Sequence, residues 1–305
     1  IKIKKNEIVS LLNNNTKWVL FLSTSHSAPE DRHIYDLSFG VMCLENAGVD
    51  PSDIFIYIDG QKRADIESKV SMGTNNTYNI RTSADFFSDI QTYSHDNLVM
   101  FVTGHGGLEG IDASPGITPH KLVDALKSSP DLQNSIVYLG QCFAGTFNYM
   151  PVGSTKESSN SVILVGATGL HPSLSLSTSE NLQGNNLRWS ANVFLLHAFK
   201  WFSTPKDMDG DGKHTIMDSY KYAGVLSNSS QVSTKAQTFV DLIGSYQELI
   251  QAANAARSTG TPLQRMQWDL EAKAKRQNYS EACSIHNVHQ ECWILNSIPA
   301  QSIEL

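Results

Sequence analysis

The sequence predicts an α/β fold with a mainly parallel sheet that carries helices on both faces. Short apolar runs rich in Val, Ile and Phe recur along the first part of the chain, and segments with helical spacing of apolar residues alternate with them. Continuous apolar runs of this length are typical of strands that are buried on both faces. Strands that alternate with helices build a parallel sheet, so both observations point to the same fold class.

Five apolar runs are predicted to be strands. They are Trp18–Ser23, Ile54–Ile58, Leu98–Thr103, Ile136–Leu139 and Val162–Val165. The last three run directly into glycine. In sheets of this kind, ligands bind beyond the carboxyl ends of the strands. The residues that follow these runs are therefore the first candidates for a functional site.

Four segments between the strands are predicted to be helices: Asp36–Glu45, Thr82–Ile90, Thr118–Leu126 and Asn192–Phe202. The third opens with Thr-Pro, an N-cap residue followed by Pro at the first helical position. The fourth is strongly apolar, and we expect it to pack on the sheet.

The pattern changes beyond about residue 220, where helical spacing continues without strands. Apolar residues follow that spacing between Phe239 and Ile250, Ser258–Pro262 interrupts it, and Leu263–Arg276 resumes it. We therefore expect a globular domain over residues 1–225 and a helical C-terminal extension over residues 226–305.

Composition excludes several classes of protein. With 40 % hydrophobic and 17 % charged residues, the 305-residue chain is neither disordered nor of low complexity. A net charge of −7 without a Lys/Arg cluster disfavours nucleic acid or an anionic membrane as a partner. No apolar stretch approaches the ~20 residues of a membrane span. No signal peptide is visible, so the protein can be cytoplasmic or secreted with its signal removed. The sequence does not indicate the oligomeric state.

A reactive side chain follows each of two predicted strands. His105 lies in the glycine-rich segment after Leu98–Thr103, and Cys142 follows Ile136–Leu139. A predicted helix connects the two strands, so a right-handed crossover makes them neighbours. An imidazole beside a thiol takes its proton or stabilises the thiolate. The two residues are therefore a candidate catalytic dyad.

Backbone N–H groups near the dyad would complete a site for acyl transfer. Gly106 and Cys142 itself are the natural donors to the oxyanion of a tetrahedral intermediate. Each dyad residue alone has an ordinary alternative, because a Cys after a strand is usually a core residue and a His between glycines is usually a loop residue. Their occurrence together at matched strand ends favours the catalytic interpretation.

The segments NLVMFVTGHGG (97–107) and IVYLGQCFAGTF (136–147) resemble the His-Gly and strand-Cys pair of caspase-fold (clan CD) cysteine peptidases, in particular the legumain and GPI-transamidase catalytic-subunit family. The resemblance covers roughly residues 15–225. It implies a three-layer caspase-like fold and a thiol endopeptidase that cleaves a protein or peptide substrate through an acyl-enzyme. A transamidase or peptide ligase of the same fold, and an inactive caspase-fold binding module, are the alternatives.

The resemblance also implies a substrate pocket. Arg32 and His33 resemble the family's Arg-His pocket loop, and Trp189 with Ser190 resembles its aromatic-lined substrate loop. The segment 166–186 would form a further wall of the pocket.

The sequence departs from the family two positions before the cysteine, where an acidic residue is usual and caspases have Gln. Gly140 stands there, so a basic P1 side chain loses its anchor. Arg32 in the pocket would favour Asp or Asn at P1. The alternative is a surface ion pair of Arg32 with Glu30 or Asp31.

One acidic loop fits a calcium site of the EF-hand type. Carboxylates stand at loop positions 1, 3, 5 and 12, with Gly at position 6. The candidate ligands are Asp207, Asp209, Asp211, the carbonyl of Lys213, and Asp218. The alternative is a tight acidic turn that binds cations weakly or not at all. The proposed chemistry requires no cofactor.

The remaining cysteines divide into two groups. Cys43 lies in an apolar helix and is predicted to be a core residue. Cys283 and Cys292 flank His286 and His289 at a constant spacing of three. Zinc sites usually split their ligands into separated pairs, which favours a disulfide in an exported protein, or free thiols, over a zinc site.

Overall fold

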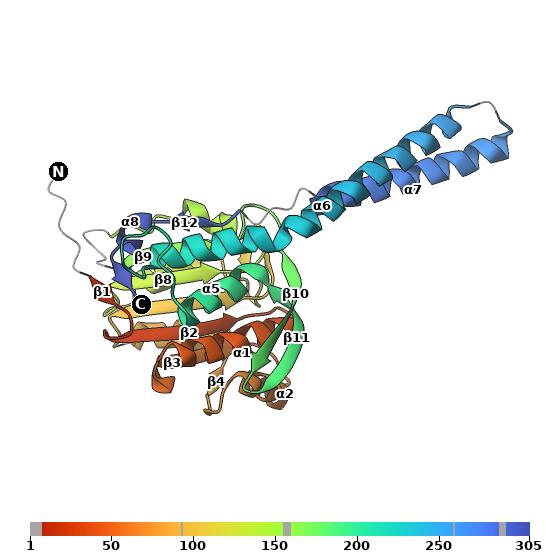
Figure 1. Ribbon diagram of the computed structural model, residues 1–305. Coiled ribbons are helices and arrows are strands. Elements are labelled where there is room, and N and C mark those ends of the chain that lie inside the picture. The colour runs from red at the N-terminus through yellow and green to blue at the C-terminus, as the bar shows by residue number, and fades with distance from the viewer. Residues whose placement is uncertain (1–7, 93, 155–159, 259, 287–290) are drawn as a thin grey trace. The chain divides into compact units, whose positions relative to one another are not determined.

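A seven-stranded sheet forms the centre of the computed structural model, which describes residues 8–92, 94–154, 160–258, 260–286 and 291–305. The strand order is β12-β9-β8-β5-β2-β3-β4, and only β12 runs antiparallel to its neighbour (Figure 1). The strands are β2 (Thr16–Leu22), β3 (Ile54–Ile58), β4 (Ile80–Arg81), β5 (Asn97–Thr103), β8 (Asn134–Leu139), β9 (Ser161–Gly166) and β12 (Trp293–Leu295). The predicted α/β class with a mainly parallel sheet is confirmed.

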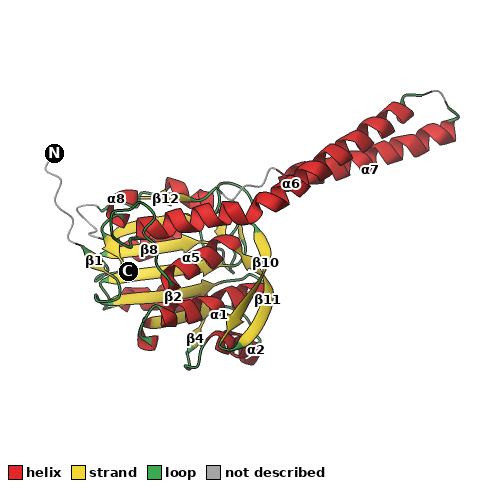
Figure 2. Cartoon of the chain, in the orientation of Figure 1, coloured by secondary structure: helices red, strands yellow, loops and turns green. Residues whose placement is uncertain are grey.

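Side chains of each central strand alternate between two apolar clusters, as the two-residue period of a strand requires. Trp18 and Leu20 of β2 belong to a cluster that includes α1 (Asp31–Asn46) and α5 (Val193–Ser203). The intervening Val19 belongs to a cluster that includes residues of α3 (Ser83–Asp89) and α4 (Pro119–Lys127). Helices therefore cover both faces of the sheet (Figure 2).

The sequence predicts the start of α4 correctly and the start of α1 incorrectly. The Thr118 hydroxyl accepts a hydrogen bond from the N–H of Lys121, as expected of the N-cap of α4. In contrast, α1 begins at Asp31, which is earlier than predicted, after an extended Glu30. Arg32 and His33 consequently lie in the first turn of a helix and not in a loop.

The segment 166–186, which was expected to form a wall of the pocket, contains most of an antiparallel hairpin. It consists of β10 (Ser175–Leu182) and β11 (Asn185–Asn192), joined by Gln183 and Gly184, both at positive φ. Trp189 and Ser190 are therefore strand residues, which corrects the predicted substrate loop. Alternate side chains of β11, Trp189 and Ala191, are buried, because this strand packs on α1.

Contacts divide the chain into two units, residues 1–227 with 290–305 and residues 228–289. The second unit comprises most of α6 (Ile216–Ala256) and α7 (Pro262–His286), with a break between them as predicted. The end of the chain belongs to the first unit, where β12 extends the sheet and β13 (Ile303–Glu304) pairs with β1 (Val9–Ser10). These strands are too short to produce a periodic signal in the sequence.

The remaining elements are short, and the longest of them is the eight-residue helix α2. They are α2 (Arg63–Val70), α8 (Ser297–Ala300), β6 (Gly106–Gly107), β7 (Gly110–Ile111) and the 3-10 helices η1 (Pro51–Asp53), η2 (Ser71–Gly73), η3 (Ile90–Thr92) and η4 (Ala144–Tyr149). Among the described residues, we find no helix that combines the length and the apolar character of a membrane span.

Candidate active site

The ends of two neighbouring strands bring His105 and Cys142 to the same edge of the sheet. β5 and β8 are parallel and paired, with Val102 opposite Leu139, so the predicted adjacency is confirmed. The two loops that follow also touch. A Cβ added at Gly106 would lie 2.4 Å from the carbonyl oxygen of Cys142. Only glycine allows this approach, so the backbone after His105 packs directly against that of Cys142.

Cys142 lies at a sharp turn between β8 and η4. Its neighbour Phe143 has φ +55°, a left-handed conformation that is uncommon for a residue with a Cβ and costs conformational energy. The Cys142 thiol is half-buried, and the sulfur accepts a hydrogen bond from the backbone N–H of Ser173 at 3.3 Å. A donor at this position stabilises a thiolate. Within the described part of the chain, the backbone N–H of Cys142 donates no hydrogen bond.

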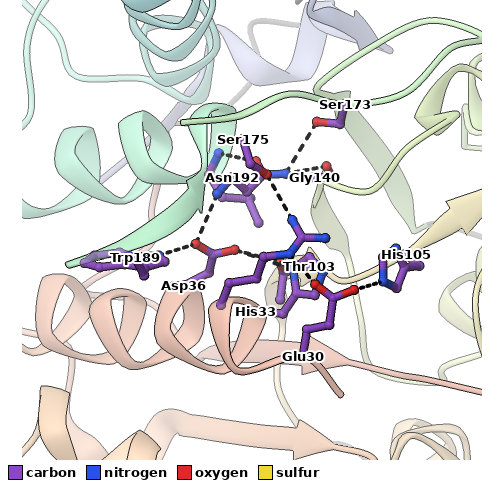
Figure 3. A network of polar contacts seen from close by, with 12 residues as sticks. Glu30, His33, Asp36, Thr103, His105, Gly140, Ser173, Ser175, Trp189 and Asn192 are labelled. Carbon is purple, nitrogen blue, oxygen red and sulfur yellow. Dashed lines mark hydrogen bonds and ion pairs between the residues drawn. The ribbon is translucent and has the colours of Figure 1, made fainter. Parts of the chain in front are cut away.

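The His105 ring has a carboxylate partner that sequence reasoning missed. Its Nε2 lies 2.7 Å from Oε1 of Glu30 (Figure 3). The other carboxylate oxygen accepts a hydrogen bond from Nε of Arg32 at 2.5 Å. Hydrogen bonds, first from Arg32 and then from His105, lower the pKa of Glu30 to about 2. Glu30 is therefore ionised at neutral pH and can hold the ring in one orientation.

The two candidate catalytic side chains have separate partners. Among the residues described, no hydrogen bond joins the His105 ring to the Cys142 sulfur, and Nδ1 of His105 makes none. With Nε2 engaged by Glu30, Nδ1 is the ring nitrogen left for proton transfer.

A buried polar network lies behind this site and contains two of the predicted pocket residues (Figure 3). Asp36, which is 3 % exposed, accepts hydrogen bonds from the Thr103 hydroxyl at 3.1 Å and from Nε1 of Trp189 at 2.9 Å. Nδ1 of His33 contacts the same Thr103 hydroxyl at 3.2 Å. Because a buried carboxylate requires donors, Trp189 satisfies Asp36 and does not line an open pocket. Ser190 is exposed on β11.

Asn192 connects three parts of the site. Its side-chain oxygen caps α5 at the N–H of Leu195, and its amide donates to the carbonyl of Gly140 at 2.6 Å. The same amide lies 3.4 Å from the hydroxyl of Ser173, whose N–H contacts the Cys142 sulfur. One side chain thus fixes the end of β8 relative to the loop that touches the thiol.

Position 140 has no room for a side chain that could line a P1 pocket. A Cβ at this position would lie 2.6 Å from Cδ1 of Leu195 and 2.9 Å from the carbonyl oxygen of Val102. The position faces α5 in the core. The absence of an acidic residue at position 140 therefore has a steric reason in this structure.

Arg32 bridges α1 and the start of β10. Besides its bond to Glu30, it donates from Nη1 to the Ser175 hydroxyl at 3.0 Å. The surface pairing with Glu30 is thus present, and the side chain is still 29 % exposed. A cleft of about 410 Å³ opens beside His105, lined by the residues from Gly106 to Ala113 together with His26 and Gly116.

The acidic loop brings three of its five predicted ligands together. Carboxylate oxygens of Asp207, Asp209 and Asp211 lie within 4.8 Å of one another. Asp207 also accepts backbone N–H groups of the loop, including that of Gly212 at 2.8 Å. Asp218 is 1 % exposed and accepts the N–H groups of Met208 and Thr215, so it is occupied at the start of α6. The Lys213 ammonium lies 3.5 Å from Glu304.

The other cysteines play no part in this edge of the sheet. Cys43 is buried, as predicted. The structure has no disulfide between Cys283 and Cys292, and the Cys292 sulfur contacts the carbonyl of Ala167. His289 lies outside the described residues. Among those that are described, no metal-type cluster includes Cys283, His286 or Cys292.

No family model matches the sequence, and no curated protein matches it. We therefore base the function on the geometry of the site.

Proposed function

We propose that the protein is a cysteine peptidase of caspase-like fold, with Cys142 as nucleophile and His105 as the proton-transfer group. The observation that carries the proposal is the direct contact between the loops after β5 and β8. That contact supports a His-Cys pair at one edge of a parallel sheet, where ligands bind in folds of this class.

The arrangement suits acyl transfer in both of its halves. The Cys142 sulfur attacks the scissile carbonyl and forms a thioester as the C–N bond breaks. Nδ1 of His105 takes the thiol proton and delivers it to the departing amine. Water then attacks the thioester, and the peptide acid and the thiol are released. The ionised Glu30 stabilises the imidazolium that forms between these steps.

The oxyanion of each tetrahedral intermediate needs donors near the sulfur. The N–H of Cys142 has no acceptor within the described residues, and the backbone of Gly106 packs against the Cys142 carbonyl oxygen. Two backbone donors at this place would supply the electrostatic stabilisation of an oxyanion hole.

Substrate selection follows from the charges beside the dyad. Arg32 is half-buried next to His105's partner Glu30, and position 140 offers no space for an acidic side chain. An Asp or Asn side chain at P1 would therefore find a guanidinium donor, whereas Lys or Arg would not find a carboxylate at position 140. The exposed Leu108 on the edge of the cleft offers an apolar contact for the rest of the peptide.

Cleavage of a P1-diverse peptide library by purified protein tests the proposal. Cys142→Ala and His105→Ala should each abolish cleavage, and a peptidyl electrophile should label Cys142 selectively. Cys283→Ser is the matched control, because Cys283 is a thiol in the second unit, and it should keep full activity. Cleavage that survives either dyad substitution would contradict the assignment.

A further inference from the structure

We propose that Glu30, His33 and His105 form a binding site for a zinc ion. One ligand atom from each residue lies within 4.8 Å of the other two. Two imidazoles and one carboxylate are a ligand set typical of zinc sites that keep their fourth position open. Magnesium and calcium prefer oxygen ligands throughout, so the set selects against them.

The three residues line one small cavity of about 70 Å³, together with Thr24, His26 and the Gly104 backbone. A water molecule takes roughly 30 Å³, so the cavity holds an ion and one further ligand. Ligand atoms about 2.0–2.2 Å from a tetrahedral zinc ion lie roughly 3.4 Å apart. The separations in the structure are at most 4.8 Å, so the ligand atoms would approach one another by up to about 1.4 Å, and the exposed side chains of Glu30 and His105 are the ones that can rotate to do so.

His33 supplies the observation that points to a ligand. It is 3 % exposed, and its Nε2 has no hydrogen-bond partner within the described residues. The Thr103 hydroxyl gives its only proton to Asp36, so it accepts from Nδ1–H of His33. Nδ1 of His33 therefore carries a hydrogen, which leaves Nε2 as the ring nitrogen that can bind a ligand. A buried acceptor without a donor costs free energy, and a metal ion would remove that cost.

The partners of His33 match those of metal-bound histidines. Such histidines usually donate their second N–H to a carboxylate or another acceptor, which fixes the ring and raises its basicity. Here Nδ1 reaches Asp36 through Thr103 and lies 3.7 Å from the Asp36 carboxylate itself. Asp36 is in turn held by Trp189 and by the N–H of Asn192.

Glu30 and His105 complete the site from the solvent side. Their side chains are 52 % and 44 % exposed, so an ion can enter without opening the core. Glu30 keeps Arg32 on Oε2 while Oε1 turns from His105 to the ion. The His105 and His33 rings stand edge to face with centroids 5.3 Å apart, so both can reach a shared ion.

Zinc at this site would occupy the ring nitrogen that Glu30 now holds and would hold His105 away from proton transfer. Zinc should therefore inhibit the peptidase reversibly, with recovery on chelation. This consequence rests on the proposed function, whereas zinc binding itself does not.

Binding is measured first, on the full chain carrying Cys142→Ala and Cys283→Ser, so that these thiols do not contribute. Isothermal titration with Zn²⁺ should show one site, and Co²⁺ should give visible bands of nitrogen and oxygen ligation without a thiolate charge-transfer band. Glu30→Gln should weaken Zn²⁺ binding at least 10-fold, and His33→Gln at least as much. Should His33→Gln fail to fold, the exposed Glu30 still tests the site. His26→Ala removes a lining residue outside the ligand set and should stay within 2-fold.

Absence of zinc binding at micromolar concentration, or binding that Glu30→Gln leaves unchanged, would overturn the site. Intact zinc binding in a protein without peptidase activity would leave the site standing and remove the proposed function. Peptidase activity that micromolar zinc does not inhibit, despite measured binding, would overturn the inhibitory role alone.

Discussion

The carboxylate of Glu30 lies 2.7 Å from Nε2 of His105, although 75 positions separate the two residues. Glu30 occupies the N-cap position of α1, yet its side chain caps no backbone group of that helix. Instead the side chain pairs with His105, which follows strand β5. A side chain that does not cap its own helix thus orients His105.

Replacement of Glu30 with Gln should lower kcat by about 10- to 100-fold and leave KM within a few-fold. The loss is expected because a neutral amide stabilises the imidazolium less well than a carboxylate does. Steady-state kinetics on the best library peptide measure this split. Glu109→Gln is the control, because Glu109 is an exposed carboxylate in the cleft beside His105, and it should change kcat little. A wild-type kcat in Glu30→Gln would show that Glu30 has no part in the reaction.

Alanine at position 106 should separate the two catalytic loops. The new Cβ would lie 2.4 Å from the Cys142 carbonyl oxygen and 2.5 Å from Cγ of Gln141, so one backbone must move. We expect a loss of about 1–3 kcal/mol in the free energy of unfolding and a fall of at least 100-fold in kcat/KM. Gly107→Ala is a close control, because no atom lies within 4 Å of its added Cβ. Equal effects at the two positions would refute the steric argument.

The parts of the fold that sequence predicts well are those with local signals. The apolar run at Ile54–Ile58 and the Thr-Pro start of α4 depend on residues next to one another, and both are found where expected. The adjacency of β5 and β8 follows from the handedness of crossovers. These signals were enough to predict that His105 and Cys142 lie at one edge of the sheet.

The site's partners were not predictable in the same way, because they come from distant segments. Glu30 has no local signal as a partner of His105, and Asn192 lies 52 positions from the carbonyl it binds. The hairpin was different, since the apolar residues Trp189 and Ala191 alternate with polar ones in the sequence, which is a signal of a strand, and both are buried in the structure.

Asn192→Ala should reduce the reactivity of Cys142 as well as stability. It removes the cap of α5 and the bond to the Gly140 carbonyl, so the end of β8 loses its support near the thiol. We expect a cost of about 1–3 kcal/mol in unfolding free energy and a several-fold slower alkylation of Cys142 by iodoacetamide. Thr118→Ala removes only the N-cap of α4 and should cost about 1 kcal/mol without slowing alkylation. Unchanged alkylation in folded Asn192→Ala would contradict this positioning role.

Calcium binding by the acidic loop stays a prediction. Three carboxylates within 4.8 Å repel one another, and the Lys221 ammonium forms its ion pair with one of them, Asp209. Millimolar Ca²⁺ should therefore raise the thermal midpoint by a few degrees, since a ligand that binds only the folded state stabilises it. Asp211→Asn should reduce that shift, and Asp241→Asn on α6 should not. A midpoint that does not respond to Ca²⁺ would favour the tight acidic turn.

The stability of the first unit should depend on pH through His197. Burial, with a smaller contribution from Lys200, lowers the pKa of this side chain from 6.5 to about 4. Between these values the unfolded chain binds a proton that the folded protein does not, so stability falls as pH decreases from 6.5 to 4. The wild type should lose about 1 kcal/mol more than His197→Gln between pH 7.5 and pH 5, because Gln does not titrate and partial exposure of the His197 ring screens part of the effect. Urea denaturation at the two pH values measures both losses, and equal losses in wild type and variant would show that His197 is protonated alike in the folded and unfolded chain.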